Sequence, residues 1–133
     1  MPLGFQIYPD LGFLFIRAQG VITQEERVQT MLAWLQDPGY KGCVDALFDI
    51  TRADSTPKLS ELRQLIALLQ QNMPDDGPRK LAIVTGRPIT FAVAQEFENL
   101  VESKGLRLKV KVFHDRDEAW HWLRPDEEQP EPR

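Results

Sequence analysis

The sequence predicts an α/β domain in which a mixed, mostly parallel five-stranded sheet is covered by four helices. Runs rich in β-branched and aromatic residues alternate with amphipathic segments along most of the chain. The first two strand-like runs are separated only by a short turn, which indicates an N-terminal β-hairpin. The length of 133 residues, with 42% apolar and 27% charged residues, fits one globular domain. The predicted element order is ββαβαβαβα.

The hairpin is predicted from residues 5–18. Residues 5–8 alternate between apolar and polar side chains, and residues 9–12 carry the turn sequence Pro-Asp-Leu-Gly. Residues 13–16 are apolar at successive positions, which is typical of a strand covered on both faces.

The first helix is predicted to begin after Thr23. Thr23 and Glu26 form a capping-box pattern, and Asp37-Pro38-Gly39 ends the segment. Four apolar residues recur on one helical face: Val28, Met31, Leu32 and Leu35.

Residues 44–50 predict a buried strand, and Thr56 with Pro57 predicts the N-cap and first turn of the second helix. The apolar residues of this helix are Leu59, Leu62, Leu65, Ile66, Leu69 and Met73. Residues 80–85 predict the next buried strand. Pro88 then begins a third helix, which Gly105 ends.

Residues 106–113 alternate between apolar and basic side chains, which predicts a half-exposed strand at a sheet edge protected by lysines. Asp115 and Glu118 predict the start of a short last helix. Because strands and helices alternate from the second strand onward, right-handed crossovers and a parallel arrangement follow.

Domain boundaries are predicted from composition. Residues 1–123 form the single domain, and residues 124–133 hold three prolines, four acids and two arginines. Such an acidic, Pro-rich segment buries little apolar surface and is expected to be a flexible tail.

Several function classes are disfavoured by composition. The net charge of -4 argues against a nucleic-acid partner, and the single cysteine excludes an internal disulfide. Two histidines offer little for a metal centre. No apolar run reaches the about 18 residues of a membrane span, and no signal-type segment is visible at the N-terminus. We therefore expect a cytoplasmic protein with no cofactor, no metal and no catalytic residues.

Three segments resemble the STAS domain superfamily, in particular its SpoIIAA-like branch. They are Gly12–Thr23, which runs from a strand into a capped helix, Leu47–Ile50 at the end of the central strand, and Val112–Trp120 entering the last helix. The resemblance covers residues 5–123. It implies a non-enzymatic bacterial-type regulatory module that binds itself or a protein partner.

The resemblance also implies a candidate phosphosite. Sporulation-type members of this superfamily carry a serine within Asp-Ser-Ser-Gly that a partner kinase phosphorylates. The corresponding region here, residues 49–57, contains Asp54-Ser55 without the glycine. Ser55 is the candidate.

Loops at the carboxyl ends of parallel strands meet at one rim of the sheet, where ligands commonly bind. The residues predicted to share this rim are Arg52, Asp54, Ser55, Thr56, Arg87, Thr90 and His114. Helix N-termini there favour an anion. The alternative is that the hydroxyls cap helices and the arginines pair with nearby aspartates.

Two functions follow as hypotheses. The first is a protein-interaction module, expected to form a homodimer, because Trp34 and Trp122 lie off the main apolar faces of their helices. The alternative is a carrier or sensor of a small apolar or lipid-like ligand, because the second and third helices are rich in Leu, Phe and Ala, and because the family resembled is structurally grouped with lipid-transfer domains.

Overall fold

A computed structural model describes residues 2–73 and 79–127 of the chain. The elements are β1 (Leu3–Tyr8), β2 (Phe13–Gly20), α1 (Gln24–Gln36), a 3-10 helix (Pro38–Gly42), β3 (Asp45–Ala53), α2 (Leu59–Asn72), β4 (Arg79–Val84), α3 (Pro88–Ser103), β5 (Leu108–Phe113) and α4 (Arg116–Leu123). Apart from the 3-10 helix, this is the predicted order.

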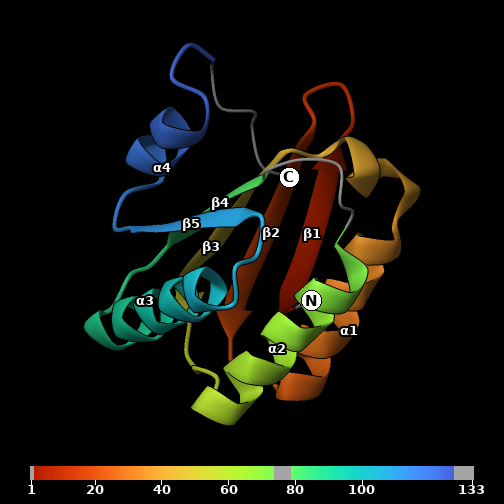
Figure 1. The fold of residues 1–133 in the computed structure, drawn as a ribbon. Coiled ribbons are helices and arrows are strands. Elements are labelled where there is room, and N and C mark those ends of the chain that lie inside the picture. The colour runs from red at the N-terminus through yellow and green to blue at the C-terminus, as the bar shows by residue number, and fades with distance from the viewer. Residues whose placement is uncertain (1, 74–78, 128–133) are drawn as a thin grey trace.

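The five strands form one sheet in the order β1-β2-β3-β4-β5 (Figure 1). β1 pairs antiparallel with β2, whereas β2 to β5 run parallel. The predicted mixed, mostly parallel sheet with an N-terminal hairpin is confirmed, and β5 with its lysines lies at an edge.

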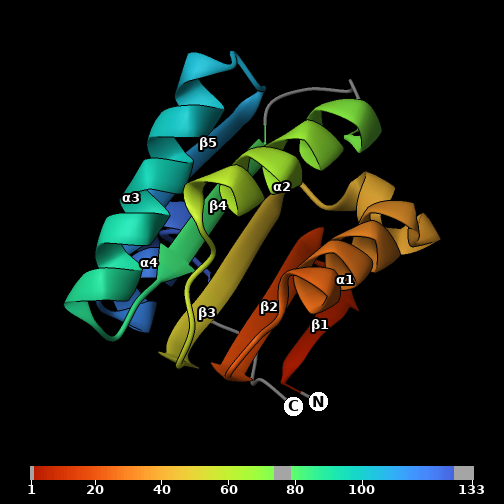
Figure 2. The same cartoon turned by 90° about the horizontal axis from the view of Figure 1, so that it is seen from below.

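Helices cover both faces of the sheet and make three layers. α1, α2 and α3 lie over one face, with α2 between the other two (Figure 2), and α4 packs on β3, β4 and β5 on the other face. Successive side chains of a strand point to opposite faces. Leu14 and Ile16 of β2 therefore join the core under α1 to α3, while Phe13 and Phe15 join the core under α4.

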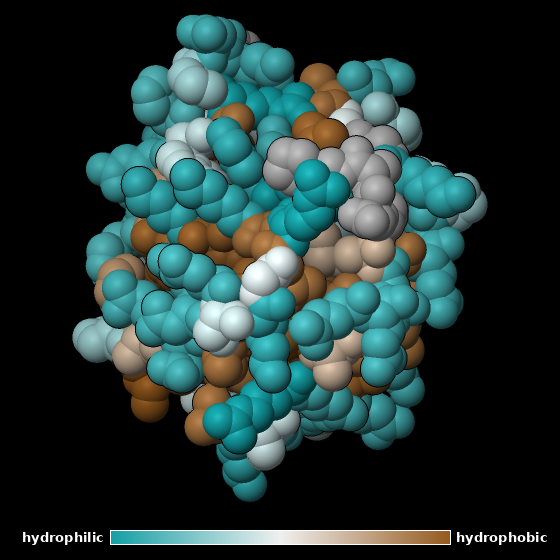
Figure 3. All heavy atoms as spheres, viewed as in Figure 1, coloured by the Kyte–Doolittle hydropathy of each residue, from teal (hydrophilic) through white to brown (hydrophobic). Residues whose placement is uncertain are grey.

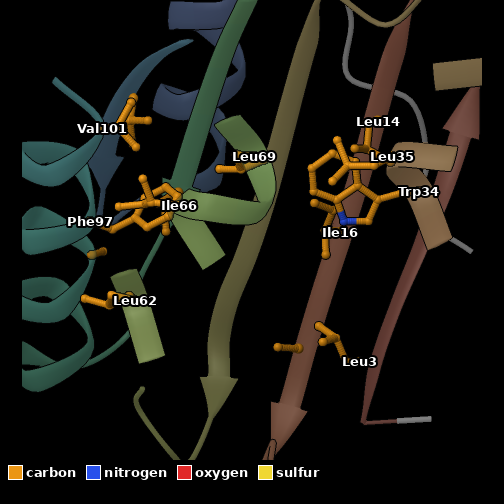
Figure 4. Close-up of a cluster of buried hydrophobic side chains, with 14 of the residues drawn as sticks. Leu3, Leu14, Ile16, Trp34, Leu35, Leu62, Ile66, Leu69, Phe97 and Val101 are labelled. Atoms are coloured by element: carbon orange, nitrogen blue, oxygen red, sulfur yellow. The ribbon is translucent and has the colours of Figure 1, made fainter. Parts of the chain in front are cut away.

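The core on the α1–α3 face has two groups of side chains in Figure 4. Ile66, Phe97 and Val101 come from α2 and α3, and Leu14 and Trp34 come from β2 and α1. Central strand β3 runs beneath the helices between these groups.

The α4 core is centred on Trp120, whose ring meets Phe13 edge-on at 4.9 Å between centroids. Arg124, directly after α4, donates from Nε to Asp45 Oδ2 at 2.9 Å and from Nη2 to the carbonyl of Gly12 at 3.2 Å. The indole of Trp120 donates to the carbonyl of Glu127 at 2.6 Å. Thus the first residues of the predicted tail contact the domain, while residues 128–133 lie outside the described part.

The boundaries of two elements differ from the sequence prediction. α2 begins at Leu59 rather than at Thr56-Pro57, because the main-chain N–H of Lys58 donates to Glu61 Oε1 at 2.9 Å and starts the helix there. β3 continues to Ala53, because Arg52 and Ala53 pair with the end of β2 after a register shift.

The two tryptophans predicted for an interface both pack on aromatic side chains of the same chain. Trp34 is only 8% exposed and packs on Tyr40 of the 3-10 helix, 5.0 Å between ring centroids. Trp122 is half-buried and packs on Phe113 of β5 at 5.7 Å. Trp34 is therefore part of the core rather than of a free surface, Trp122 keeps part of its ring exposed, and the homodimer stays a prediction.

Candidate functional site

An apolar cavity of about 160 Å³ lies between the sheet and helices α1, α2 and α3. Leu62, Leu65 and Leu69 of α2 line one side, and Phe48 and Ile50 of β3 line the other. Figure 3 shows hydrophobic residues at the floor of a hollow that crosses this face of the molecule. One water molecule needs about 10–15 Å³ of such space, so the cavity has room for about ten groups of the size of a water molecule.

The central strand is not fully covered at the cavity. Phe48 and Ile50 lie on β3, in the middle of the sheet, yet both are only half-buried. α2 shares the core with the sheet and also packs on its two neighbouring helices. The side-chain amide of Gln24 in α1 donates to the carbonyl of Glu61 and to Gln64 Oε1, both at 3.0 Å, and so ties α1 to α2.

One end of the cavity, near the carboxyl end of β3, is polar. Arg27 of α1 and Ser55 of the β3–α2 loop both line it, and Arg27 Nη2 lies 3.4 Å from Ser55 Oγ. Thr30 and Thr56 add two hydroxyls to the lining. Burial lowers the pKa of Arg27, against the raising effect of Glu61 and Glu26.

The other end is closed by main chain. Arg79, 4% exposed, donates to the carbonyls of Tyr40, Lys41 and Cys43, and its guanidinium lies 4.8 Å from the centre of the Tyr40 ring. The thiol of Cys43 is 3.5 Å from the carbonyl of Gly39, and burial raises its pKa. Because the neutral thiol is favoured, Cys43 is poorly suited to act as a nucleophile.

The predicted rim is only partly brought together. Arg87 and Asp54 form an ion pair across the β3 and β4 loops, with both side chains about half exposed. Arg52 lies in β3 and is exposed rather than in a loop. Thr90 is buried, and its hydroxyl donates to the carbonyl of Arg87 at 2.9 Å. His114 stacks on Phe91 of α3 at 4.4 Å.

Ser55 joins two loops of the rim. Its hydroxyl accepts from the N–H of Ile22 at 2.8 Å and donates to the carbonyl of Ile22 at 3.2 Å. Phosphorylation of Ser55 stays a prediction, and it would remove the bond in which Ser55 donates, because the ester oxygen has no proton.

Within residues 2–73 and 79–127, no three His, Cys, Asp or Glu side chains gather as a metal site would require. Over the same residues, no helix combines the length and apolar character needed to cross a bilayer.

The predicted site residues included Ser55 and Thr56, which line the cavity, but not Arg27. Arg27 has the pattern of an ordinary solvent-facing arginine on an amphipathic helix. Its position one turn before Met31, which also lines the cavity, was the only available signal.

The sequence of this three-layer domain matches a known family. The family model described as SpoIIAA-like matches residues 13–124. The chain belongs to the SpoIIAA-like family. This SpoIIAA-like domain therefore has the STAS-type fold expected from its sequence, and the match runs from the first residue of β2 to Arg124 after α4. No curated protein matches the chain.

Proposed function

We propose that this SpoIIAA-like domain works by binding a small apolar ligand between its sheet and helices α1, α2 and α3. The observation that carries the proposal is the 160 Å³ cavity with an almost entirely apolar lining. A well-packed core of this size leaves few voids larger than a water. A cavity lined by leucine, isoleucine and phenylalanine favours apolar ligands over water.

The proposal assigns binding rather than catalysis to the site. The polar residues at one end of the cavity are the guanidinium of Arg27 and several hydroxyls. At the other end lie the buried Arg79, Asp45, which pairs with Arg124, and Lys80, whose ammonium lies over the ring of Trp122. A nucleophile paired with a base, as covalent catalysis requires, is not assembled by these cavity-lining residues.

Filling the cavity tests this proposal. Ala46 of β3 lines the cavity and is half-buried, so Ala46→Phe places a ring in the empty space. We expect the affinity for octan-1-ol, measured by NMR titration, to fall at least about tenfold, because the ring excludes the probe. The thermal midpoint should hold or rise, because cavity filling commonly stabilises.

The matched control is Ala92→Phe, which places the same ring at an exposed position of α3 outside the cavity lining. This variant should bind octan-1-ol like the wild type. Equal binding by Ala46→Phe and Ala92→Phe, or no binding of octan-1-ol by the wild type, would contradict the proposal.

A second candidate is a protein-docking surface at the carboxyl ends of the strands. Three large apolar side chains are exposed at this end: Val21 at 70%, Ile89 at 61% and Leu59 at 45%. They precede or begin α1, α3 and α2, beside the Arg87–Asp54 pair. Exposed apolar residues rimmed by charge are typical of interaction sites.

If a second copy of the chain covers this surface, the protein sediments as a dimer that Ile89→Ser dissociates. Burial of a large aliphatic side chain contributes about 1.5–3 kcal/mol, so its loss should weaken a dimer about tenfold or more. Leu11→Ser, in the turn at the opposite end of β2, is the control and should leave the dimer intact. If the wild-type protein stays monomeric at high concentration, a second copy of the chain does not cover this surface.

A further inference from the structure

The proposed function does not specify the head group of the ligand. The polar residues at one end of the cavity indicate its charge. Arg27 carries a positive charge into the lining of a cavity that is otherwise apolar at its centre. Burying a charge without an opposite charge is unfavourable, so the partners of Arg27 decide what the site can accept.

The hydrogen-bond partners of Arg27 are neutral. Nη1 donates to Gln24 Oε1 at 3.3 Å, and Nη2 donates to Ser55 Oγ at 3.4 Å. Both distances are at the long limit for hydrogen bonds. Among the ion pairs of the described chain, none includes Arg27.

The two nearest carboxylates, those of Glu26 and Glu61, are engaged in capping their own helices. Glu26 Oε1 accepts from the N–H of Thr23 at 3.2 Å and from its hydroxyl at 3.0 Å. Glu61 Oε1 accepts from the N–H of Lys58 at 2.9 Å. They raise the pKa of Arg27, but burial outweighs them and lowers it, so the guanidinium lacks full compensation for its charge.

The other arginine of the lining differs. Arg79 is held by three main-chain carbonyls and the face of Tyr40, so its donors serve the local structure. Arg27 is half-buried and lies near two further hydroxyls of the lining, those of Thr30 and Thr56. The cavity thus has a guanidinium and hydroxyls at one end, and most of the rest of its lining is apolar.

We propose that the ligand is a single-chain amphiphile with an anionic head group, in which the chain fills the cavity and the head group binds Arg27. This inference rests on the proposed apolar binding function and adds the charge and orientation of the ligand. A guanidinium binds a carboxylate through two parallel hydrogen bonds, which strengthens and orients the contact.

The test compares three probes with the same eight-carbon chain: octanoate, octan-1-ol and octylammonium. NMR titrations of the full chain at pH 7.5 give the three affinities. We expect octanoate to bind about tenfold more tightly than octan-1-ol, because a charge-assisted contact adds to the same apolar burial. Octylammonium should bind more weakly than either, because like charges repel.

Arg27→Gln should lower the affinity for octanoate about tenfold and leave that for octan-1-ol within about twofold, which also shows that the variant is folded. Arg27→Lys should keep the preference for octanoate. Arg63→Gln, an exposed arginine of α2 outside the lining, is the matched control and should change no affinity.

The outcomes separate the two claims. If octan-1-ol binds as tightly as octanoate, or if Arg27→Gln keeps the preference for octanoate, the head-group assignment is wrong and the apolar cavity remains. If none of the three probes binds, both the assignment and the proposed function fail.

Discussion

We expect Arg124→Met to lower the free energy of unfolding by about 3 kcal/mol in urea denaturation. Arg124 and Asp45 are 10% and 12% exposed, and their side chains meet at 2.9 Å. Removing one partner of such a pair leaves the other charge buried without a counter-charge. For a fully buried pair, the loss of stability is typically about 3–5 kcal/mol. Burial alone would lower the pKa of Arg124, yet hydrogen bonds to Glu127 and Asp45 raise it, so the charged form is favoured.

A second substitution distinguishes the buried charge from lost packing. Adding Asp45→Asn to Arg124→Met removes the stranded carboxylate, so the double variant should recover part of the loss. Arg63→Met, on the exposed surface of α2, is the control and should change stability by less than about 0.5 kcal/mol. Equal effects of Arg124→Met and Arg63→Met would show that the pair does not hold α4 to β3.

The element order could be predicted from the sequence because each element has a local signal. The capping box at Thr23 and Glu26 is present with both bonds, and the Pro-Asp-Leu-Gly turn joins two antiparallel strands. The lysines of β5 mark an edge strand, as predicted. Local chemistry decides these features, so the sequence alone suffices.

Errors arose where two local signals competed or where a partner was distant in sequence. Thr56-Pro57 and Lys58 with Glu61 both offer a start for α2, and the second prevails. Trp34 lies off the main apolar face of α1, but Tyr40 in the unpredicted 3-10 helix buries it. Neither outcome is decided by helical periodicity.

The alternative function, a carrier of an apolar ligand, implies a cavity, but its position could not be predicted, because its lining has the same composition as a closed core. Phe48 and Ile50 on a central strand predict full burial, yet both line the cavity and are half-buried. The burial of these two side chains depends on how the helices above them pack together, and α2 packs on both α1 and α3. The rim residues, in contrast, follow from strand order, and the Asp54–Arg87 pair brings two of them together.

Gly86→Ala should lower the free energy of unfolding by about 3 kcal/mol. A Cβ at Gly86, between β4 and α3, would lie 2.7 Å from the carbonyl oxygen of Thr51 and 3.2 Å from its Cα. Both atoms belong to the main chain of β3, so relief requires the loop or the strand to move, and overpacking of this kind costs about 1–3 kcal/mol or more.

The matched control is Gly4→Ala in β1, where a Cβ would meet no heavy atom within 4 Å. This substitution should be neutral or slightly stabilising, because alanine reduces the freedom of the unfolded chain. Urea denaturation of both variants isolates the contact with Thr51 from the general effect of replacing glycine. Similar stabilities for the two variants would mean that the β4–α3 loop moves without cost. In that case, the contact between Gly86 and Thr51 would not fix the position of the neighbouring Arg87–Asp54 pair.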